Sequence, residues 1–328
     1  MHSSRLIRVL AAWLLGLMLA IVAAIATVML VNTRVYGPHQ QVESYLEALR
    51  QGEGERALGL LNASVPDSTN AALLDGPALQ RAAQGVENVQ VGEPQAAGEN
   101  RVEVDVNYTI DDAAHATAFQ LEKTGTEWLF FDRWEFVPST LPMLEVSVIN
   151  QNDATLNGTR VLMPEGRNRF AAFYPAEVEA HYTSEYFAAP AQTVAVTDRQ
   201  QAPAGLNLAT AATPALTDAV TAQLKTFLDD CAKQTVFQPA NCPFGFETER
   251  RVAGSIKWSI TEYPEVRIEP FNGDWVIAPL TGTVQLETSL QDLFTGVIEP
   301  VTVPQEYGFT ARLAVTDEGI TVTPVVEY

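Results

Sequence analysis

Residues whose types and spacing could do chemistry are sparse in this sequence. The motifs of serine hydrolases, zinc proteases, P-loop proteins and dinucleotide-binding proteins (G-x-S-x-G, H-E-x-x-H, G-x-x-x-x-G-K-[ST] and G-x-G-x-x-G) do not occur in its 328 residues. With only 4 His residues, acid–base chemistry would rest on carboxylates such as the adjacent pairs Asp111–Asp112 and Asp229–Asp230. We interpret these pairs as turn residues and a solvated helix face, and predict no enzyme and no catalytic, cofactor-binding or metal-binding residues.

The two cysteines, Cys231 and Cys242, are 11 residues apart. An even pair at this spacing predicts one disulfide if the segment folds in an oxidising compartment. A metal site would need more ligands than two thiols, and a catalytic thiol would need a His nearby in sequence. Both alternatives are weak here because no His lies near either cysteine.

Four tryptophans fall on expected strands and could line a ligand cavity. Aromatic residues on strands more often belong to a core, which is the interpretation we prefer. These residues are Trp128, Trp134, Trp258 and Trp275.

One apolar stretch, Val9–Val31, contains no charged residue. A helix of this length reaches roughly 34 Å and can cross a hydrocarbon core of about 30 Å. We therefore predict a signal-anchor helix over 9–31. The predicted membrane-anchor residues of this helix are Val9, Trp13, Leu17, Ile21 and Val31.

Arg5 and Arg8 precede the apolar stretch, and Arg34 alone follows it closely. This bias predicts residues 1–8 in the cytoplasm and residues 36–328 outside a cell membrane crossed once. A cleaved signal peptide with Ala24 and Ala26 at its cleavage site is the alternative, although cleavable apolar regions are usually shorter.

Charge excludes some partners. The chain carries 20 basic and 40 acidic residues, a formal net charge of −20. Such an excess of negative charge argues against nucleic acid or an anionic lipid surface as the ligand. It does not by itself identify a cationic partner.

Residues 38–137 are predicted to form an α+β domain. Val42, Tyr45, Leu46 and Leu49 make one apolar stripe of a helix over 38–52. Helices over 55–61 and 77–84 follow, the last with Asp75 as its cap and Gly85 as its stop. Strands are expected over 86–91, 101–110, 115–123 and 127–136, with turns at Asp111–Asp112 and at Thr124–Gly125.

The segment PHQQVESYLEALRQGEGERALGLL, with its Gly and Glu residues ahead of Ala57–Leu58, resembles the first helices of extracytoplasmic domains with a particular cone-shaped fold. Nuclear transport factor and ketosteroid isomerase share this fold, and the resemblance covers about 38–137. More distantly, the chain resembles the teicoplanin-resistance-associated membrane proteins of Gram-positive bacteria, which stack such domains on one span. No cysteine precedes Cys231, so their N-terminal zinc ribbon is absent. Isomerase chemistry is not carried over, because Asp105 and Tyr108 fall on opposite faces of one strand.

Two further domains are predicted after a hinge at Pro138–Pro142. Residues 143–198 form a small β domain with a hairpin turn at Asn157–Gly158. Residues 198–213 are interpreted as a linker or an edge strand. Residues 214–328 form a second α+β domain, in which Thr213 caps a helix that packs against an antiparallel sheet.

Together these features predict an α+β protein of the cell envelope, anchored by one span, with a non-enzymatic interaction or scaffold role. Its partner would be another envelope protein or the cell wall. The alternative is a small-molecule or lipid-binding protein, with an apolar cavity between the helix over 38–50 and the sheet face of Tyr108 and Phe119.

Overall fold

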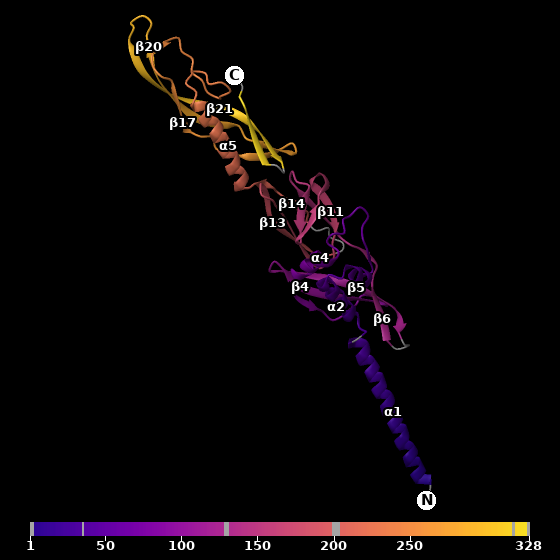
Figure 1. Ribbon diagram of the computed structural model, residues 1–328. Helices are drawn as coiled ribbons and strands as arrows, with labels where there is room; N and C mark the ends of the chain where they lie inside the picture. The colour runs from indigo at the N-terminus through magenta and orange to yellow at the C-terminus, as the bar shows by residue number, and fades with distance from the viewer. Residues whose placement is uncertain (1–2, 35, 128–130, 199–203, 317–318, 327–328) are drawn as a thin grey trace. The chain divides into compact units, whose positions relative to one another are not determined.

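The computed structural model describes residues 3–34, 36–127, 131–198, 204–316 and 319–326 (Figure 1). The chain is an α+β protein, rich in strand, with a single apolar helix near its N-terminus. It divides into two compact units. The first unit consists of Met1–Ser147, Asn152–Ala180 and Ala191–Asn207, and the second of Val148–Gln151, His181–Pro190 and Leu208–Tyr328.

Three short helices follow the apolar helix α1 (Ser3–Arg34) in the first unit. They are α2 (Pro38–Gln51), α3 (Gly54–Leu61) and α4 (Gly76–Gln84). Helix α2 begins with Pro38 in its first turn and ends at Gly52, whose φ of 72° lies in the left-handed region. The predicted stripe of Val42, Tyr45, Leu46 and Leu49 is buried, as the helical period requires.

Asp75 occupies the N-cap position of α4 but does not cap the helix with its side chain. Its Oδ1 instead accepts a hydrogen bond of 2.9 Å from the backbone N–H of Gly54. The predicted N-cap hydrogen bond from α4 to Asp75 is therefore wrong. The Asp75 carboxylate accepts from the first residue of α3 instead, because that residue lies within hydrogen-bond distance. This contact joins two helices that are separated by a long loop in sequence.

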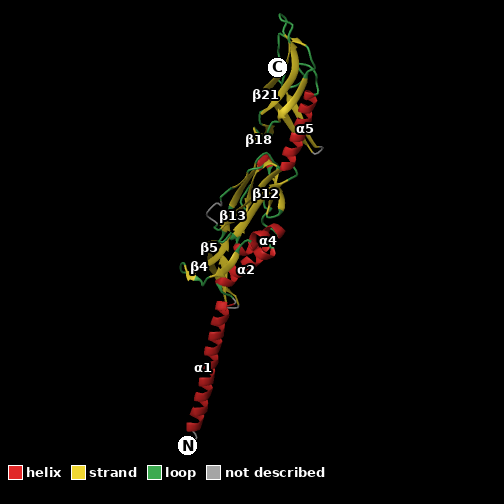
Figure 2. Ribbon diagram, turned by 90° about the vertical axis from the view of Figure 1, so that its left-hand side faces the viewer, coloured by secondary structure: helices red, strands yellow, loops and turns green. Residues whose placement is uncertain are grey.

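An antiparallel sheet of the first unit has the strand order β2-β4-β5-β6, with β3 also paired to β4. The strands are β2 (Glu87–Val91), β3 (Gln95–Ala96), β4 (Arg101–Ile110), β5 (Ala113–Glu127) and β6 (Phe131–Phe136). The predicted turn at Asp111–Asp112 is confirmed, with positive φ at both residues. Figure 2 shows α2 and α4 on one side of β4 and β5.

The predicted turn at Thr124–Gly125 is wrong, because β5 continues through both residues to Glu127. The pairing of β5 with β6 shifts register between Lys123 and Gly125, so this pair marks a bulge and the strand does not reverse. Strand β6 begins at Phe131, and the predicted strand residues Trp128 and Phe130 lie outside the described residues.

The segment predicted as a hinge, Pro138–Pro142, is fixed to the rest of the first unit. It contains β7 (Ser139–Thr140), which pairs in parallel with β1 (Ala63–Ser64). Leu141 is buried, and its N–H donates a 3.0 Å hydrogen bond to the carbonyl of Ser64. A free hinge is therefore the wrong interpretation, because β7 is paired with β1 and Leu141 is buried.

The residues from Met143 to Ala212 form two sheets, with strand orders β10-β9-β12-β13-β15 and β11-β8-β14. Strands of the first sheet are β9 (Asp153–Leu156), β10 (Thr159–Leu162), β12 (Ala176–Thr183), β13 (Phe187–Val196) and β15 (Ala211–Ala212), and those of the second are β8 (Met143–Val148), β11 (Arg167–Ala171) and β14 (Leu206–Leu208). A 3-10 turn covers Pro164–Gly166. The Asn157–Gly158 turn is confirmed between β9 and β10. Of the two interpretations of 198–213, the edge strand is confirmed in part, because β14 and β15 each end a sheet, while 199–203 lie outside the described residues.

The second unit packs one helix, α5 (Pro214–Ala232), against an antiparallel sheet of order β16-β20-β21-β22, with β17 also paired to β20. Its strands are β16 (Arg251–Val252), β17 (Lys257–Glu262), β20 (Leu280–Gln291), β21 (Ile298–Thr316) and β22 (Gly319–Val325), and a separate hairpin contains β18 (Ile268–Phe271) and β19 (Asp274–Ile277). Thr213 is the cap of α5, as predicted, and its Oγ1 accepts from the N–H of Leu216. Residues 317–318, which connect β21 and β22, lie outside the described residues.

Candidate anchor and interaction surfaces

Helix α1 (Ser3–Arg34) contains one segment, Leu10–Asn32, that is long and apolar enough to cross a membrane. Its mean hydropathy is 2.8, and none of it is buried inside the protein. Trp13, Leu17 and Ile21, predicted as anchor residues, are 77%, 59% and 49% exposed. The hydroxyl of Thr27 donates to the carbonyl of Ala23 at 2.8 Å, so the polar group inside this segment is satisfied by its own helix.

The N-terminal part of α1 includes Arg5, Arg8 and Val9, whose side chains lie outside the described part of the structure. Their predicted role in orientation stays a prediction. At the other end Val31 is half-buried, and Asn32 Oδ1 accepts a 2.7 Å hydrogen bond from the N–H of Asp132 on β6. The ring of Tyr36 also stacks on Phe131 at 4.7 Å. The exit of the helix is thus attached to the first unit.

The predicted disulfide between Cys231 and Cys242 is confirmed. Both cysteines are buried, at the end of α5 and in the turn that follows it. The side chain of Gln234 accepts from the N–H of Ala240 at 2.9 Å and donates to its carbonyl at 3.2 Å, which closes the same loop. No free cysteine is found among the described residues.

The acidic pairs serve local structure. Asp111 and Asp112 form the β4–β5 turn, and Asp111 Oδ2 accepts a 2.7 Å hydrogen bond from Thr193. On α5, Asp229 accepts a short hydrogen bond from the hydroxyl of Tyr263, and this contact is the largest cause that raises the pKa of Tyr263. Among the described residues, no group of three or more His, Cys, Asp and Glu side chains is placed to hold a metal.

The space expected to be an apolar cavity in the first unit is filled by aromatic rings. Tyr45 of α2 is fully buried, and its ring lies 5.7 Å from those of both Phe119 and Phe136 and 6.2 Å from that of Phe173. Its hydroxyl donates a 2.7 Å hydrogen bond to the carbonyl of Tyr174, and burial raises its pKa. Tyr108 and Phe119 are each 2% exposed. This packing gives the small-molecule alternative no support at that place.

A groove of about 1060 Å³ lies in the second unit. Its walls come from the β12–β13 turn at Tyr182–Phe187, from Gly273–Val276 and from Ala311–Thr316, with Asn150 and Gln151 beside them. The rings of Phe187 and Trp275 stack at 4.5 Å. Asn150 Nδ2 donates a hydrogen bond of 2.9 Å to the carbonyl of Asp274, and the hydroxyl of Tyr182 donates one of 2.8 Å to Gln151 Oε1. These hydrogen bonds join the walls of the groove.

Of the four tryptophans considered from sequence, Trp275 lines this groove. Trp258 belongs to the core of the second unit and donates from Nε1 to the carbonyl of Val236 at 2.8 Å. Trp134 is half-buried on β6, and Trp128 lies outside the described residues. The Nε1 atom of Trp275 is buried and has no hydrogen-bond partner among the described residues.

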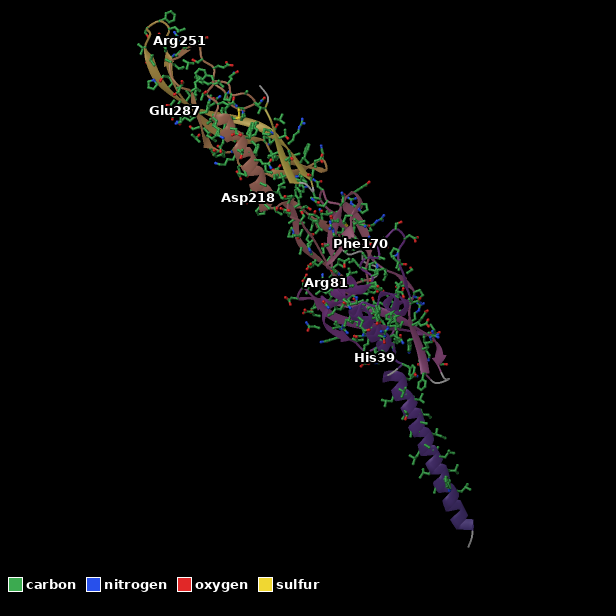
Figure 3. All side chains as sticks on the ribbon, viewed as in Figure 1. His39, Arg81, Phe170, Asp218, Arg251 and Glu287 are labelled. Atoms are coloured by element: carbon green, nitrogen blue, oxygen red, sulfur yellow. A yellow bond between two sulfur atoms is a disulfide. The ribbon has the colours of Figure 1, made fainter. Side chains whose placement is uncertain are left out.

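The turn between β20 and β21 presents a second exposed apolar surface, the tip formed by Leu293, Phe294, Val297 and Ile298. Phe294 is fully exposed and Leu293 is 68% exposed. Arg251, labelled in Figure 3, marks this end of the hairpin because β16 pairs with the last residues of β20. Sequence reasoning missed the tip, although an apolar dipeptide between Asp292 and Thr295–Gly296 is a detectable signal.

Asp292 accepts three hydrogen bonds within the turn that carries the tip. Its Oδ1 accepts from the N–H of Thr295 at 2.8 Å, from the N–H of Phe294 at 2.9 Å and from the Thr295 hydroxyl at 3.0 Å. The N–H groups of Thr295 and Phe294 lower the pKa of Asp292 because they stabilise its carboxylate. An exposed aromatic side chain on an ordered turn loses little entropy when a partner covers it.

Comparison with known proteins adds no relative: no family model, curated protein or solved structure matches this chain.

Proposed function

We propose that this protein is a single-pass membrane protein whose residues 36–328 lie outside the cytoplasm and bind another protein of the cell envelope. The observation that carries the proposal is α1, whose apolar side chains are exposed along most of the candidate span Leu10–Asn32. Such a surface is stable in lipid and costly in water. The basic residues Arg5 and Arg8 support the orientation.

The disulfide supports the same compartment. Cys231 and Cys242 are bonded in the second unit, and structural disulfides persist in oxidising compartments. The finer assignment of a cone-like fold to 38–137 also belongs to this proposal. It is supported by α2, which packs its buried stripe against β4 and β6 of an antiparallel sheet.

An interaction role is supported by the tip and by the groove. Exposed apolar side chains held on an ordered turn are typical of binding surfaces, and Phe294 is the most exposed aromatic side chain at the tip. The partner is expected to be a protein, with a component of the cell wall as the second candidate.

Orientation is tested by replacing Leu162, which is 74% exposed in the first unit, with cysteine. The natural cysteines are bonded and buried, so they do not react. We expect a membrane-impermeant maleimide to label the Leu162→Cys variant in intact source cells. Labelling only after the cells are opened would contradict the proposed orientation.

The interaction role is tested in the same cells with a photo-crosslinking amino acid at position 294 of the full chain. The matched control carries it at Leu162, another exposed apolar position. A crosslinked protein or wall fragment specific to position 294 supports the role. Equal products at both positions, or a chain that is alone at both, would refute it.

A further inference from the structure

Strand β21 changes partners along its length. Strand β20 pairs with it from Ile298 to Phe309, and β22 pairs with it from Thr310 to Thr316. The segment Thr310–Thr316 therefore has a paired neighbour on one side only. Its other side pairs with no strand among the described residues, and we call this side the open edge. Ala311–Thr316 forms one wall of the groove, and β19, which supplies another wall, also contacts β21.

The side chain of Gln223 on α5 shows which backbone groups face which side. Its Nε2 donates to the carbonyl of Ile320 at 3.0 Å, and its Oε1 accepts from the N–H of Val322 at 3.0 Å. Ile320 and Val322 thus direct their backbone groups away from β21. Residues opposite each other in an antiparallel ladder share this property.

The partners of Ile320 and Val322 are Val315 and Leu313. Their N–H and C=O groups therefore face the open edge, as do those of Ala311, two residues earlier and opposite Pro324. Among the described residues, these groups have no backbone partner on that side. The open edge thus offers the N–H and C=O groups of Ala311, Leu313 and Val315. The six residues Ala311–Thr316 extend over roughly 20 Å.

An extended peptide is the ligand that satisfies such an edge, because its own N–H and C=O groups alternate at the same spacing. The stacked rings of Phe187 and Trp275 provide an apolar contact for one of its side chains. The groove volume of about 1060 Å³ leaves room for a short segment.

Charge selects among possible peptides. Glu185 and Asp274 line the groove together with Arg312, and the whole chain has a formal net charge of −20. A basic segment is attracted by this field, whereas a second copy of the chain is repelled.

We propose that the groove of the second unit binds an extended basic segment of a partner protein, which adds as a strand to the open edge of β21 at Ala311–Val315. This inference rests on the interaction role proposed above and names the chemistry of the partner.

The test measures binding of the fluorescent eight-residue peptide KTVTFTVK to the full chain in nanodiscs. A fully N-methylated form of the same peptide keeps the side chains and charges but has no backbone donor. We expect the N-methylated form to bind at least about tenfold more weakly, since each lost backbone hydrogen bond weakens binding severalfold. Equal binding of the two forms, or no binding of either, would overturn strand addition.

The Leu313→Pro variant blocks the edge from the side of the protein. Because the N–H of Leu313 faces away from β22, proline removes no hydrogen bond of the ladder, as is common on edge strands. The Leu313→Val variant keeps the N–H and is the matched control. Peptide binding should fall about tenfold in the proline variant and persist in the valine variant.

Amide exchange of Thr321 and Thr323 in β22 shows whether the Leu313→Pro variant is folded. If both amides keep their protection and peptide binding is unchanged, the inference fails. Crosslinking at position 294 is an independent readout. A partner still captured there while the peptide does not bind would leave the proposed function standing without strand addition.

Discussion

Tyr45 in the first unit and Trp275 in the second both contact aromatic rings, Tyr45 edge-on and Trp275 by stacking, yet the two side chains differ in how completely they are enclosed. Tyr45 lies on the buried face of α2, which packs it against Phe119, Phe136 and Phe173 and leaves it fully buried. Among the described residues the ring of Trp275 contacts one other ring, that of Phe187, and Trp275 lines an open groove. Aromatic residues alone therefore do not distinguish a core from a binding surface; the covering element does.

The same contrast occurs at the two edges of the β21–β22 ribbon. Gln223 of α5 satisfies Ile320 and Val322 on the outer edge of β22. No such side chain is found at Leu313 and Val315 among the described residues. Covered edges protect a sheet from unwanted pairing, so the open edge is where pairing with a partner is possible.

The largest expected effect is at Tyr45. The Tyr45→Ala variant removes a fully buried ring and should lower the free energy of unfolding of the first unit by about 3–5 kcal/mol. Hydrogen exchange of the α2 amides in the full chain measures it. The Tyr45→Phe variant keeps the ring and leaves the Tyr174 carbonyl without its 2.7 Å partner, so its loss should be about 1–2 kcal/mol. Equal losses in the two variants would mean that the hydroxyl, and not the packing of the ring, accounts for the contribution of Tyr45 to the free energy of unfolding.

A smaller loss is expected at Trp275. The Trp275→Ala variant loses the stack on Phe187, and the free energy of unfolding of the second unit should fall by roughly 1–2 kcal/mol. Urea unfolding followed by exchange of the β19 amides gives the value. If the loss matched that of Tyr45→Ala, the groove would be a core, and the contrast between the two regions would disappear.

Gln223 tests the covered edge. Replacement by leucine removes both hydrogen bonds to β22 but keeps a similar volume, and we expect a loss of about 1 kcal/mol because water reaches this exposed edge. Exchange of the Val322 amide should accelerate. The Gln223→Glu variant retains the acceptor for Val322 and should protect that amide; an unprotected amide there would show that the contact is incidental.

The smallest effects concern pH, and they have opposite signs in the two units. Burial, followed by the charges of Asp111, Glu179 and Glu87, raises the pKa of Glu177 in the first unit above 4.5. Its contribution to stability is fully present below pH 4.5 and is lost as pH rises through the raised value. The melting temperature of the first unit should thus increase on mild acidification, and the Glu177→Gln variant should reduce this increase.

Asp292 in the second unit behaves in the opposite way. Its pKa lies below 3.8, so its contribution is present above pH 3.8 and is lost as pH falls through the lowered value. Exchange of the Phe294 and Thr295 amides should accelerate in that acidic range. The Asp292→Asn variant keeps an acceptor oxygen and should show a weaker pH dependence. Equal pH dependence in variant and parent would exclude Asp292 as the cause.

Much of the fold could be predicted because its signals are local. The apolar stripe of α2, the Asn157–Gly158 turn and the Thr213 cap each depend on residues a few positions apart. The apolar segment of α1 and the cysteine pair are equally local, so the anchor candidate and the disulfide were within reach of the sequence. The Thr124–Gly125 turn failed because a bulge and a reversal use the same residues, and pairing with β6 decides between them.

The groove depends on contacts that no local pattern contains. Phe187, Trp275 and Leu313 are far apart in sequence and meet only when the strands are paired. The open edge exists because β20 begins at Leu280, opposite Phe309, while β21 continues to Thr316. The sequence by itself determined helices, turns, the apolar segment and the disulfide, whose free energies come from neighbours along the chain. Tertiary structure alone decided which aromatic rings are covered and which strand edge stays open, because both depend on distant segments that compete for the same surface.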